Sequence, residues 1–485
     1  MHLSFWQTNC PEWISFIIFL ILIIALVSVS ELLLRNRILS AEASRIFVHS
    51  AVGISCSLSP FIFISKNFPI ILGMLFLFLN IIALKLEKFK GIHSQKRESY
   101  GTIYFPLSYL FMVSFFWDFS QYFVIAFSIL AIADPLATFI GESVPSPLKI
   151  ILESDKKSFQ GSIAMFCSSC VIVYIWSSIL LSQFTSFNMI YFILITAIIS
   201  TLAEMISFKG SDNLSIPLVS FLTMYSMEIK GPNFEFILIF IIIGFFIAYY
   251  FKMITASGFI GALIMGFLIT GYGGINYLIP IAIFFILSSI LSKIIPGNTS
   301  TISKGSKRDI IQVYANGGIA LLLCIYSQFY ENTTSIYLLF LSSIAAATAD
   351  TWGTELGKLS KTNPVSIINF NYVLPGQSGG ITRIGIIGSL LGASIIGFTS
   401  HIIGIMDYGV IGIIIAGFSG CIIDSILGAS LQAKYQTKDG QIVEYITKKE
   451  ILVNGYRWMT NDMVNLLSTL SAPILMHFYI KTFYI

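Results

Sequence analysis

The chain has 485 residues, of which 56% are hydrophobic and only 11% are charged, and its formal net charge is +4. A soluble domain carries roughly 25% charged residues, so this composition excludes a set of water-soluble domains. The small net charge, without a basic tail, also argues against binding to nucleic acid. The sequence therefore predicts a protein of the lipid bilayer.

Apolar stretches follow one another along the whole chain and predict an all-α polytopic membrane protein with about sixteen transmembrane helices. In the first half these stretches cover 13–34, 46–65, 69–86, 103–117, 120–140, 161–182, 187–206 and 214–229. In the second half they cover 234–251, 257–270, 275–292, 312–329, 334–350, 383–402, 408–430 and 463–483. The first stretch is too long for the core of a signal peptide, so we expect a retained helix. A seam near 230–233 predicts two fused helical bundles, residues 1–231 and 232–485.

The basic residues predict the orientation of this fold. With the N-terminus outside and the chain crossing at each helix, about 25 of the 28 Lys and Arg fall on the inner side. The long loops fall there too, namely 86–102, 141–160, 293–311, 351–382 and 431–462. We therefore expect a cell inner membrane or its equivalent, with the motif loops on the cytoplasmic side. Polar residues that gather at inner helix ends favour a membrane-surface enzyme over a transporter, whose critical residues lie near the midplane.

In the first half, acidic, basic and glycine-containing motifs meet at inner helix ends. Mg²⁺ prefers one or two carboxylates together with phosphate oxygens, which suits Asp134 in the segment 133–141. The segment 156–162 places lysines and a Gly-Ser pair at a helix N-terminus, where exposed N–H groups favour phosphate. The residues that we expect to contact phosphate lie on the same side: Lys96, Arg97, Lys156, Ser158, Gly161, Ser162, Asp212 and Asn213. Taken singly, lysines here are also typical of topology anchors, and Gly-Ser pairs of helix packing.

These motifs resemble the CTP-dependent polyprenol kinases, the family of phytol kinase and dolichol kinase, over roughly residues 10–230. The resemblance rests mainly on 133–141 and 156–162, and a helix start with Arg45 and His49 is similar as well. It implies transfer of the γ-phosphate of a nucleotide, usually CTP, to a long-chain isoprenoid alcohol. We expect Asp134 and Lys157 to act in catalysis, with Asp134 as a metal ligand.

The second half carries a denser set of motifs, in 303–309, 312–318, 348–357, 375–382, 420–425 and 458–465. Acids that converge at helix ends need Mg²⁺ to stay ionised, which predicts these metal ligands: Asp350, Glu355, Asp424 and Asp462. Asp350 and Glu355 would diverge on an ideal helix, unless a helix end between them lets both face one ion. The residues that we expect to contact phosphate or nucleotide are Lys304, Lys307, Arg308, Asn316, Gly376, Gly379, Gly380, Arg383 and Asn461. Gly379 and Gly380 are equally compatible with an ordinary loop.

Over roughly residues 250–485 these motifs resemble the integral membrane family that contains the phytyl-phosphate kinases of plants and cyanobacteria. The two resemblances together imply a fused enzyme that phosphorylates phytol or geranylgeraniol to the monophosphate and then to the diphosphate, using CTP or another nucleotide triphosphate. Its partners would be the isoprenoid alcohol, its monophosphate, the nucleotide and the bilayer. We expect Asp350 and Asp424 to be catalytic in the second step. Two alternatives remain open: a cytidylyltransferase-like enzyme that forms a CDP-lipid, and a transporter or flippase.

Overall fold

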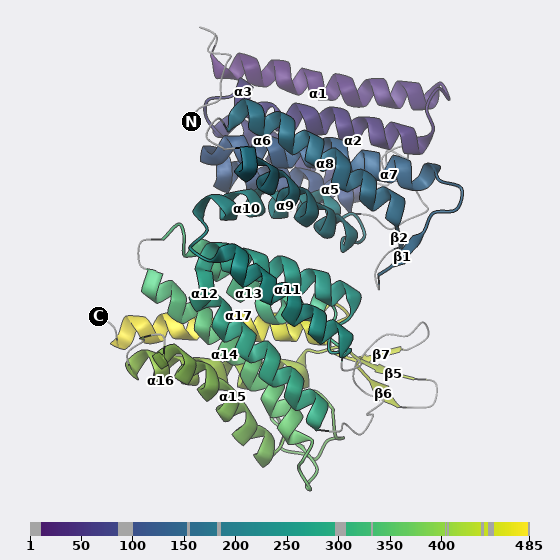
Figure 1. Ribbon diagram of the computed structural model, residues 1–485. Coiled ribbons are helices and arrows are strands. Elements are labelled where there is room, and N and C mark those ends of the chain that lie inside the picture. Colours follow the sequence, from purple (N-terminus) through teal and green to yellow (C-terminus); the bar gives the residue numbers. More distant parts are fainter. Residues whose placement is uncertain are drawn as a thin grey trace. The chain divides into compact units, whose positions relative to one another are not determined.

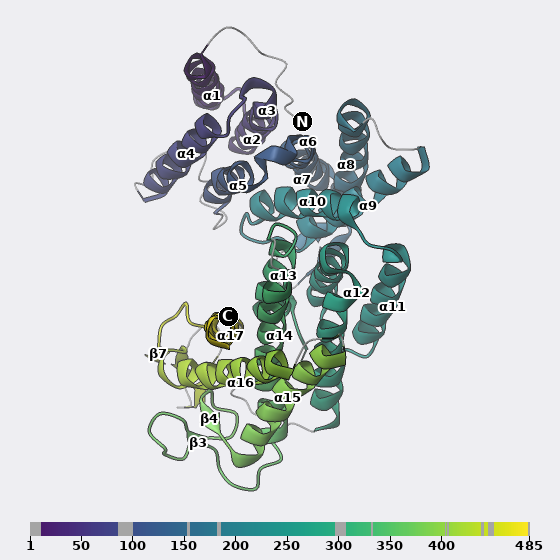
Figure 2. The same cartoon turned by 90° about the vertical axis from the view of Figure 1, so that its left-hand side faces the viewer.

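The computed structural model describes residues 11–85, 100–152, 156–181, 186–295, 307–330, 333–402, 404, 407–437, 441–444 and 451–483. Over these residues the fold is almost entirely helical, with two two-stranded sheets and one three-stranded sheet at helix ends (Figures 1 and 2). The chain divides into two compact units, Met1–Glu228 and Ile229–Ile485. The predicted all-α polytopic membrane fold is confirmed.

Unit 1 begins with α1 (Glu12–Arg35), α2 (Ala41–Ser57), α3 (Ser59–Ile62), α4 (Asn67–Lys85) and α5 (Gly101–Phe116). A continuous helical stretch follows, made of a 3₁₀ turn η1 (Trp117–Phe119), α6 (Ser120–Ser128), a π-helical turn η2 (Ile129–Ala133) and α7 (Asp134–Ser143). The unit ends with β1 (Lys149–Ile151), β2 (Lys156–Ser158), α8 (Phe159–Leu180), α9 (Ser186–Met205) and α10 (Asp212–Ile229).

The core of unit 1 surrounds α6 and η2. Residues 123–127 and 129–131 are fully buried, and both α2 and α8 pack against η2. The outer helices are apolar on every side, and on α1 the side chains of Ile18 and Ile21 are 63% and 60% exposed. A helix that is apolar all round belongs in lipid. The buried stretch therefore forms a rigid support for the first residue of α7, Asp134.

Unit 2 contains α11 (Phe234–Tyr250), α12 (Ala256–Ile294), α13 (Ile310–Tyr326), α14 (Thr333–Gly357), β3 (Val365–Ser366), β4 (Gly380–Ile381), α15 (Arg383–Ile402), α16 (Asp407–Ser430), β5 (Lys434–Gln436), β6 (Ile442–Val443), β7 (Ile451–Asn454) and α17 (Asn461–Phe483). Helix α12 bends at Gly274, whose φ of 63° is left-handed, between the stretches 257–270 and 275–292 that the sequence predicts as separate helices. Helix α14 lies at the centre of the unit and packs against α12, α13, α15, α16 and α17 (Figure 1).

A glycine face on α15 allows this helix to lie directly on α14. A Cβ atom at Gly388 would come within 2.7 Å of the Trp352 carbonyl oxygen, and one at Gly392 within 2.7 Å of the Thr348 carbonyl oxygen. Small residues at this spacing are typical of helix pairs in membranes, because they let the two backbones approach closely. This contact fixes the end of α14 that carries Asp350.

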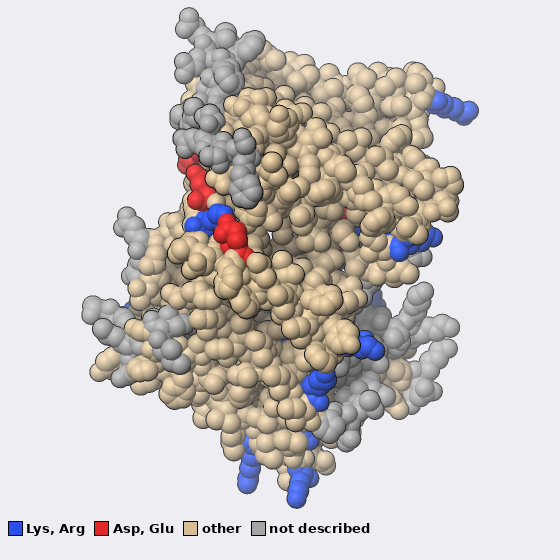
Figure 3. Space-filling view, in the orientation of Figure 1, with Lys and Arg blue, Asp and Glu red and all other residues tan. Residues whose placement is uncertain are grey.

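Among the described residues, nine helical stretches are long and apolar enough to cross a membrane, and α11 and α13 are shorter apolar helices. Figure 3 shows one face of the molecule on which Lys, Arg, Asp and Glu are few and the surface over the helices is almost uncharged. Such a surface is suited to contact with lipid.

Candidate active sites

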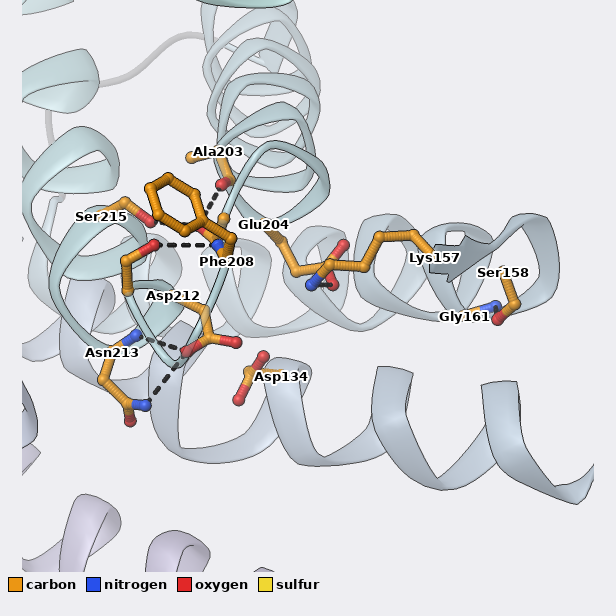
Figure 4. Close-up of polar contacts among 12 residues, drawn as sticks. Asp134, Lys157, Ser158, Gly161, Ala203, Glu204, Phe208, Asp212, Asn213 and Ser215 are labelled. Atoms are coloured by element: carbon orange, nitrogen blue, oxygen red, sulfur yellow. Dashed lines mark hydrogen bonds and ion pairs between the residues drawn. The ribbon is translucent and has the colours of Figure 1, made fainter. Parts of the chain in front are cut away.

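In unit 1, four ionisable residues from distant parts of the sequence meet at one end of the helices. Asp134 is the first residue of α7, Lys157 lies in β2, Glu204 is close to the end of α9, and Asp212 is the first residue of α10. Figure 4 shows the carboxylates of Asp134 and Asp212 facing one another, while Lys157 reaches across to Glu204. The cluster therefore contains three acids and one lysine.

Lys157 is held by a close ion pair. Its Nζ lies 2.6 Å from Glu204 Oε1, and the two side chains are only 18% and 9% exposed. Burial opposes the positive charge, but Glu204, Asp212 and Asp134 outweigh it and hold the pKa of Lys157 above its ordinary value. Lys157 thus presents a fixed, protonated ammonium group beside the two aspartates.

The segment that follows Lys157 explains how the lysine is placed. Ser158 caps α8, since its hydroxyl accepts a hydrogen bond from the Gly161 N–H at 3.1 Å. A Cβ atom at Gly161 would come within 2.9 Å of the Ala137 carbonyl oxygen, so glycine lets α8 begin directly against α7. Ser162 is buried, and its hydroxyl has no hydrogen-bond partner in the described part of the chain. Ser158 and Gly161 therefore have clear structural roles at this helix start.

Asp134 and Asp212 form a pair of like charges. Asp212 Oδ1 accepts hydrogen bonds from the Asn213 main-chain N–H at 2.9 Å and from its Nδ2 at 3.1 Å. Asp134 is repelled by Asp212 and Glu204 and attracted by Lys157 and Arg45. Its side chain is 14% exposed. Like charges in such a shielded place favour a bound cation.

The residues present fit a Mg²⁺ ion that arrives with a nucleotide. Within the described ranges, no group of three or more His, Cys, Asp or Glu side chains is arranged to hold a metal alone. Mg²⁺ is commonly held by one or two carboxylates, with substrate phosphates and water as the other ligands. Asp134 and Asp212 provide two such carboxylates.

Two other predicted residues, Lys96 and Arg97, lie outside the described residues, as does the side chain of Lys156.

In unit 2, Asp350 on α14 and Asp424 on α16 interact electrostatically as a second pair of like charges. One turn before Asp424, Cys421 Sγ lies 3.3 Å from Ser389 Oγ of α15. When the Asn465 amide is oriented so that its nitrogen donates, this nitrogen lies 3.3 Å from Asp424 Oδ2 and 3.2 Å from the Asn461 carbonyl oxygen. The motif ends of α14, α15, α16 and α17 thus meet at one end of the unit.

Glu355 does not join this pair. Helix α14 continues through both Asp350 and Glu355, so there is no helix end between them that would let both face one ion. Five residues along a helix turn the side chain by roughly 140°. Glu355 instead accepts hydrogen bonds from Ser292 Oγ at 2.9 Å and Lys358 Nζ at 2.5 Å, on the side of α12.

Arg308 lies near Glu355 in a second polar group. Its guanidinium is 5.2 Å from the ring centroid of Phe284 and 5.6 Å from that of Phe285. Burial lowers the pKa of Arg308 to about 10, although Glu355 acts in the opposite direction. The main chain of Arg308 is fixed by the Thr255 N–H, which donates to its carbonyl oxygen at 3.0 Å. A shielded guanidinium of this kind is well suited to an anionic ligand.

The predicted glycine-rich loop binds a carboxylate of the protein itself, that of Glu444. Gly376 and Gly379 have left-handed φ values of 86° and 82°. Between them, Ser378 donates to Glu444 from its main-chain N–H at 2.8 Å and from its hydroxyl at 2.5 Å, and Gln432 Nε2 donates to the same carboxylate at 3.0 Å. Burial raises the pKa of Glu444.

The other predicted residues of unit 2 are more dispersed. Asn316 donates to the Gln312 carbonyl oxygen of its own helix at 2.9 Å, and Gly380 pairs with Ser366 between β3 and β4. Lys307 and Arg383 are exposed, and Asp462 lies in the first turn of α17. Lys304 lies outside the described residues.

Three residues at these sites had no predicted role: His49, Glu204 and Glu444. His49 contacts Asp134, Glu204 contacts Lys157, and Glu444 occupies the glycine-rich loop. Glu204 was detectable, because an acid near the end of an otherwise apolar stretch is a functional candidate by default. Nothing in the sequence connects Glu444 to a loop 66 residues away.

The family described as integral membrane protein DUF92 matches residues 238–473. An uncharacterized membrane protein of Methanocaldococcus jannaschii is 35% identical over 188 residues, which cover 38% of this chain and 76% of that protein. The chain belongs to this integral membrane family.

Two further proteins are similar to this chain. Protein PGR of Arabidopsis thaliana is 29% identical over 255 residues, covering 45% of this chain and 88% of that protein. The phytol kinase of Synechocystis is 27% identical over 220 residues, covering 44% of this chain and 92% of the kinase. No solved structure matches the chain. The two family resemblances predicted from the sequence are confirmed.

Proposed function

We propose that this chain is a membrane-bound isoprenoid kinase with two sites, one in each unit. Unit 1 transfers the γ-phosphoryl group of a nucleotide triphosphate, CTP by family resemblance, to a long-chain isoprenoid alcohol. Unit 2 transfers a second phosphoryl group to the resulting monophosphate and forms the diphosphate. The observation that carries this proposal is the cluster of Asp134, Asp212 and a protonated Lys157, which come from α7, α10 and β2. The similarity to phytol kinase supports an isoprenoid alcohol as the substrate.

The chemistry asked of unit 1 is positioning and charge neutralisation. Phosphoryl transfer passes through a loose transition state in which charge lies on the phosphate oxygens. Asp134 and Asp212 would hold Mg²⁺, which supplies charge neutralisation at the phosphates when bound. Lys157 adds a point charge whose direction is fixed by Glu204. Its raised pKa keeps the ammonium protonated throughout the range in which enzymes are assayed.

Unit 2 offers a comparable set for the second transfer. Asp350 and Asp424 form the acidic pair, and Asn465 donates to Asp424 when its amide is so oriented. Arg308, whose guanidinium lies over the rings of Phe284 and Phe285, would neutralise a phosphate. The monophosphate has an apolar tail and a charged head, so it stays at the membrane surface between the two steps. We place both sites at the cytoplasmic face, a proposal supported by the segregation of Lys and Arg along the sequence.

Product analysis with the purified protein tests the reaction type. The protein is incubated with CTP or ATP, labelled in either the α- or the γ-phosphate, and with phytol, geranylgeraniol or their monophosphates. We expect γ-label in the lipid monophosphate and diphosphate and no α-label in any lipid. Transfer of α-label with release of pyrophosphate would instead identify a cytidylyltransferase, and substrate uptake without nucleotide consumption would identify a transporter.

A further inference from the structure

The helix that leads to Asp134 leaves one carbonyl group without its usual donors. In the π-helical turn η2, the Asp134 N–H bonds to the Ile129 carbonyl oxygen, five residues back. An α-helix would send this N–H to the Leu130 carbonyl instead. The residue five positions after Leu130 is Pro135, which has no N–H. The Leu130 carbonyl therefore receives neither the α-helical hydrogen bond from residue 134 nor a π-helical one from residue 135. Leu130 is fully buried.

His49 of α2 takes the place of these donors. Its Nε2 lies 3.0 Å from the Leu130 carbonyl oxygen, although the two residues are 81 positions apart in sequence. A carbonyl oxygen only accepts hydrogen bonds, so the hydrogen resides on Nε2. The same nitrogen is 3.7 Å from Asp134 Oδ2, and the ring packs edge-on against Phe105 with centroids 5.5 Å apart.

Helix α2 contacts η2 at a second point, one turn further on. A Cβ atom at Gly53 would come within 2.6 Å of the Ala131 Cβ, so glycine permits the close approach that brings His49 to Leu130. Two residues on one face of α2 thus fit a carbonyl and a methyl group of the same π-helical turn. Single π-turns inside α-helices occur frequently at functional sites.

We infer that His49 is a positioning residue for the carboxylate of Asp134. By donating to the Leu130 carbonyl, His49 stabilises the π-helical register of η2. If that register were lost, the Asp134 N–H would return to Leu130 and the residue would turn about the helix axis, by roughly 100° for each residue of slip. Asp134 would then no longer face Asp212. For its kinetic consequences, this inference rests on the proposed function of unit 1.

A matched pair of variants separates the hydrogen bond from the packing of the ring. H49F keeps an aromatic ring beside Phe105 but removes the donor, and H49Q keeps an N–H donor of similar reach. G53A pushes α2 away from η2, and I54A, at a residue that is 38% exposed on the same helix, is the control. Kinase activity on the isoprenoid alcohol is measured at a series of Mg²⁺ concentrations. Hydrogen exchange of the backbone over 129–140 is measured on the same samples.

We expect H49F to lower kcat on the order of tenfold and to raise the Mg²⁺ concentration for half-maximal rate, since Asp134 is misdirected. H49Q should retain the wild-type kcat and Mg²⁺ dependence. G53A should resemble H49F, and the two changes combined should be no worse than H49F alone. Exchange over 129–140 should accelerate in H49F and G53A but not in H49Q or I54A. The exchange result stands even if no kinase activity is found, in which case only the proposed function fails. Unchanged exchange in H49F, or equal losses in H49F and H49Q, would overturn the inference.

Discussion

The ion pair between Lys157 and Glu204 gives an asymmetric prediction, because its two partners have different neighbours. In Lys157→Met, Glu204 loses its cation and remains beside Asp134, so three acids face one another. In Glu204→Gln, Lys157 keeps both Asp134 and Asp212 as counter-charges. Removal of the lysine should therefore be much more damaging than removal of the glutamate.

The magnitude follows from the burial of the pair, whose side chains are 18% and 9% exposed. Loss of one partner from a buried pair costs about 3–5 kcal/mol, and we expect Lys157→Met to fall in this range. Glu204→Gln should cost about 1–3 kcal/mol, the penalty of one unmatched polar group. At roughly 2–4 °C per kcal/mol for a unit of this size, the two melting temperatures should fall by about 10 °C and about 5 °C. Loss of the ammonium should also slow phosphoryl transfer by about 10²–10³.

The assay is thermal melting of the purified protein in detergent, together with the rate of monophosphate formation. The matched control is Lys149→Met, because Lys149 is an exposed lysine on the neighbouring strand β1. This control should melt and react like the wild type. A Lys157→Met variant that is no less stable than Glu204→Gln and keeps its kinase rate would contradict the role of Lys157 as the charge that balances these acids.

Four further substitutions test other parts of the two sites. Asp134→Asn and Asp350→Asn each remove one member of a like-charge pair, so both should raise the melting temperature while abolishing one phosphorylation step; a loss of stability would contradict this. Glu444→Gln places an amide N–H opposite the two donors of Ser378, so the free energy of unfolding should fall by about 1–3 kcal/mol, as measured by melting. An unchanged melting temperature would show that the loop does not need an anion. Gly388→Ala forces α14 and α15 apart and should slow only the second step, by product analysis; equal slowing of both steps would argue against a local effect.

Most of the helices were predictable, because a helix that spans lipid needs a long apolar segment and charged residues lie at the ends of these segments. Even the break in α12 at Gly274 follows from the gap between two apolar stretches. The residues of the unit 1 site were also largely predictable, since Asp134, Lys157 and Asp212 all belong to polar motifs beside predicted helix ends. In the structure, however, Asp134 lies within a continuous helical stretch that ends only at Ser143.

The orientation of the site side chains, by contrast, depends on tertiary contacts that no local sequence pattern predicts. The π-helical turn before Asp134 depends on Pro135 together with a histidine from another helix. In unit 2, the separation of Glu355 from Asp350 depends on whether α14 continues, and the sequence left open a helix end between them. Hydrogen bonds and packing between distant segments decide such choices.

The most direct test of two separate sites is product analysis with Asp134→Asn and Asp350→Asn, each supplied with isoprenoid alcohol or with its monophosphate. We expect Asp134→Asn to leave the alcohol unchanged but still to convert added monophosphate to diphosphate. We expect Asp350→Asn to convert the alcohol to monophosphate, which then accumulates. A variant that abolishes both steps, or variants that abolish neither, would contradict the assignment of one phosphorylation to each unit.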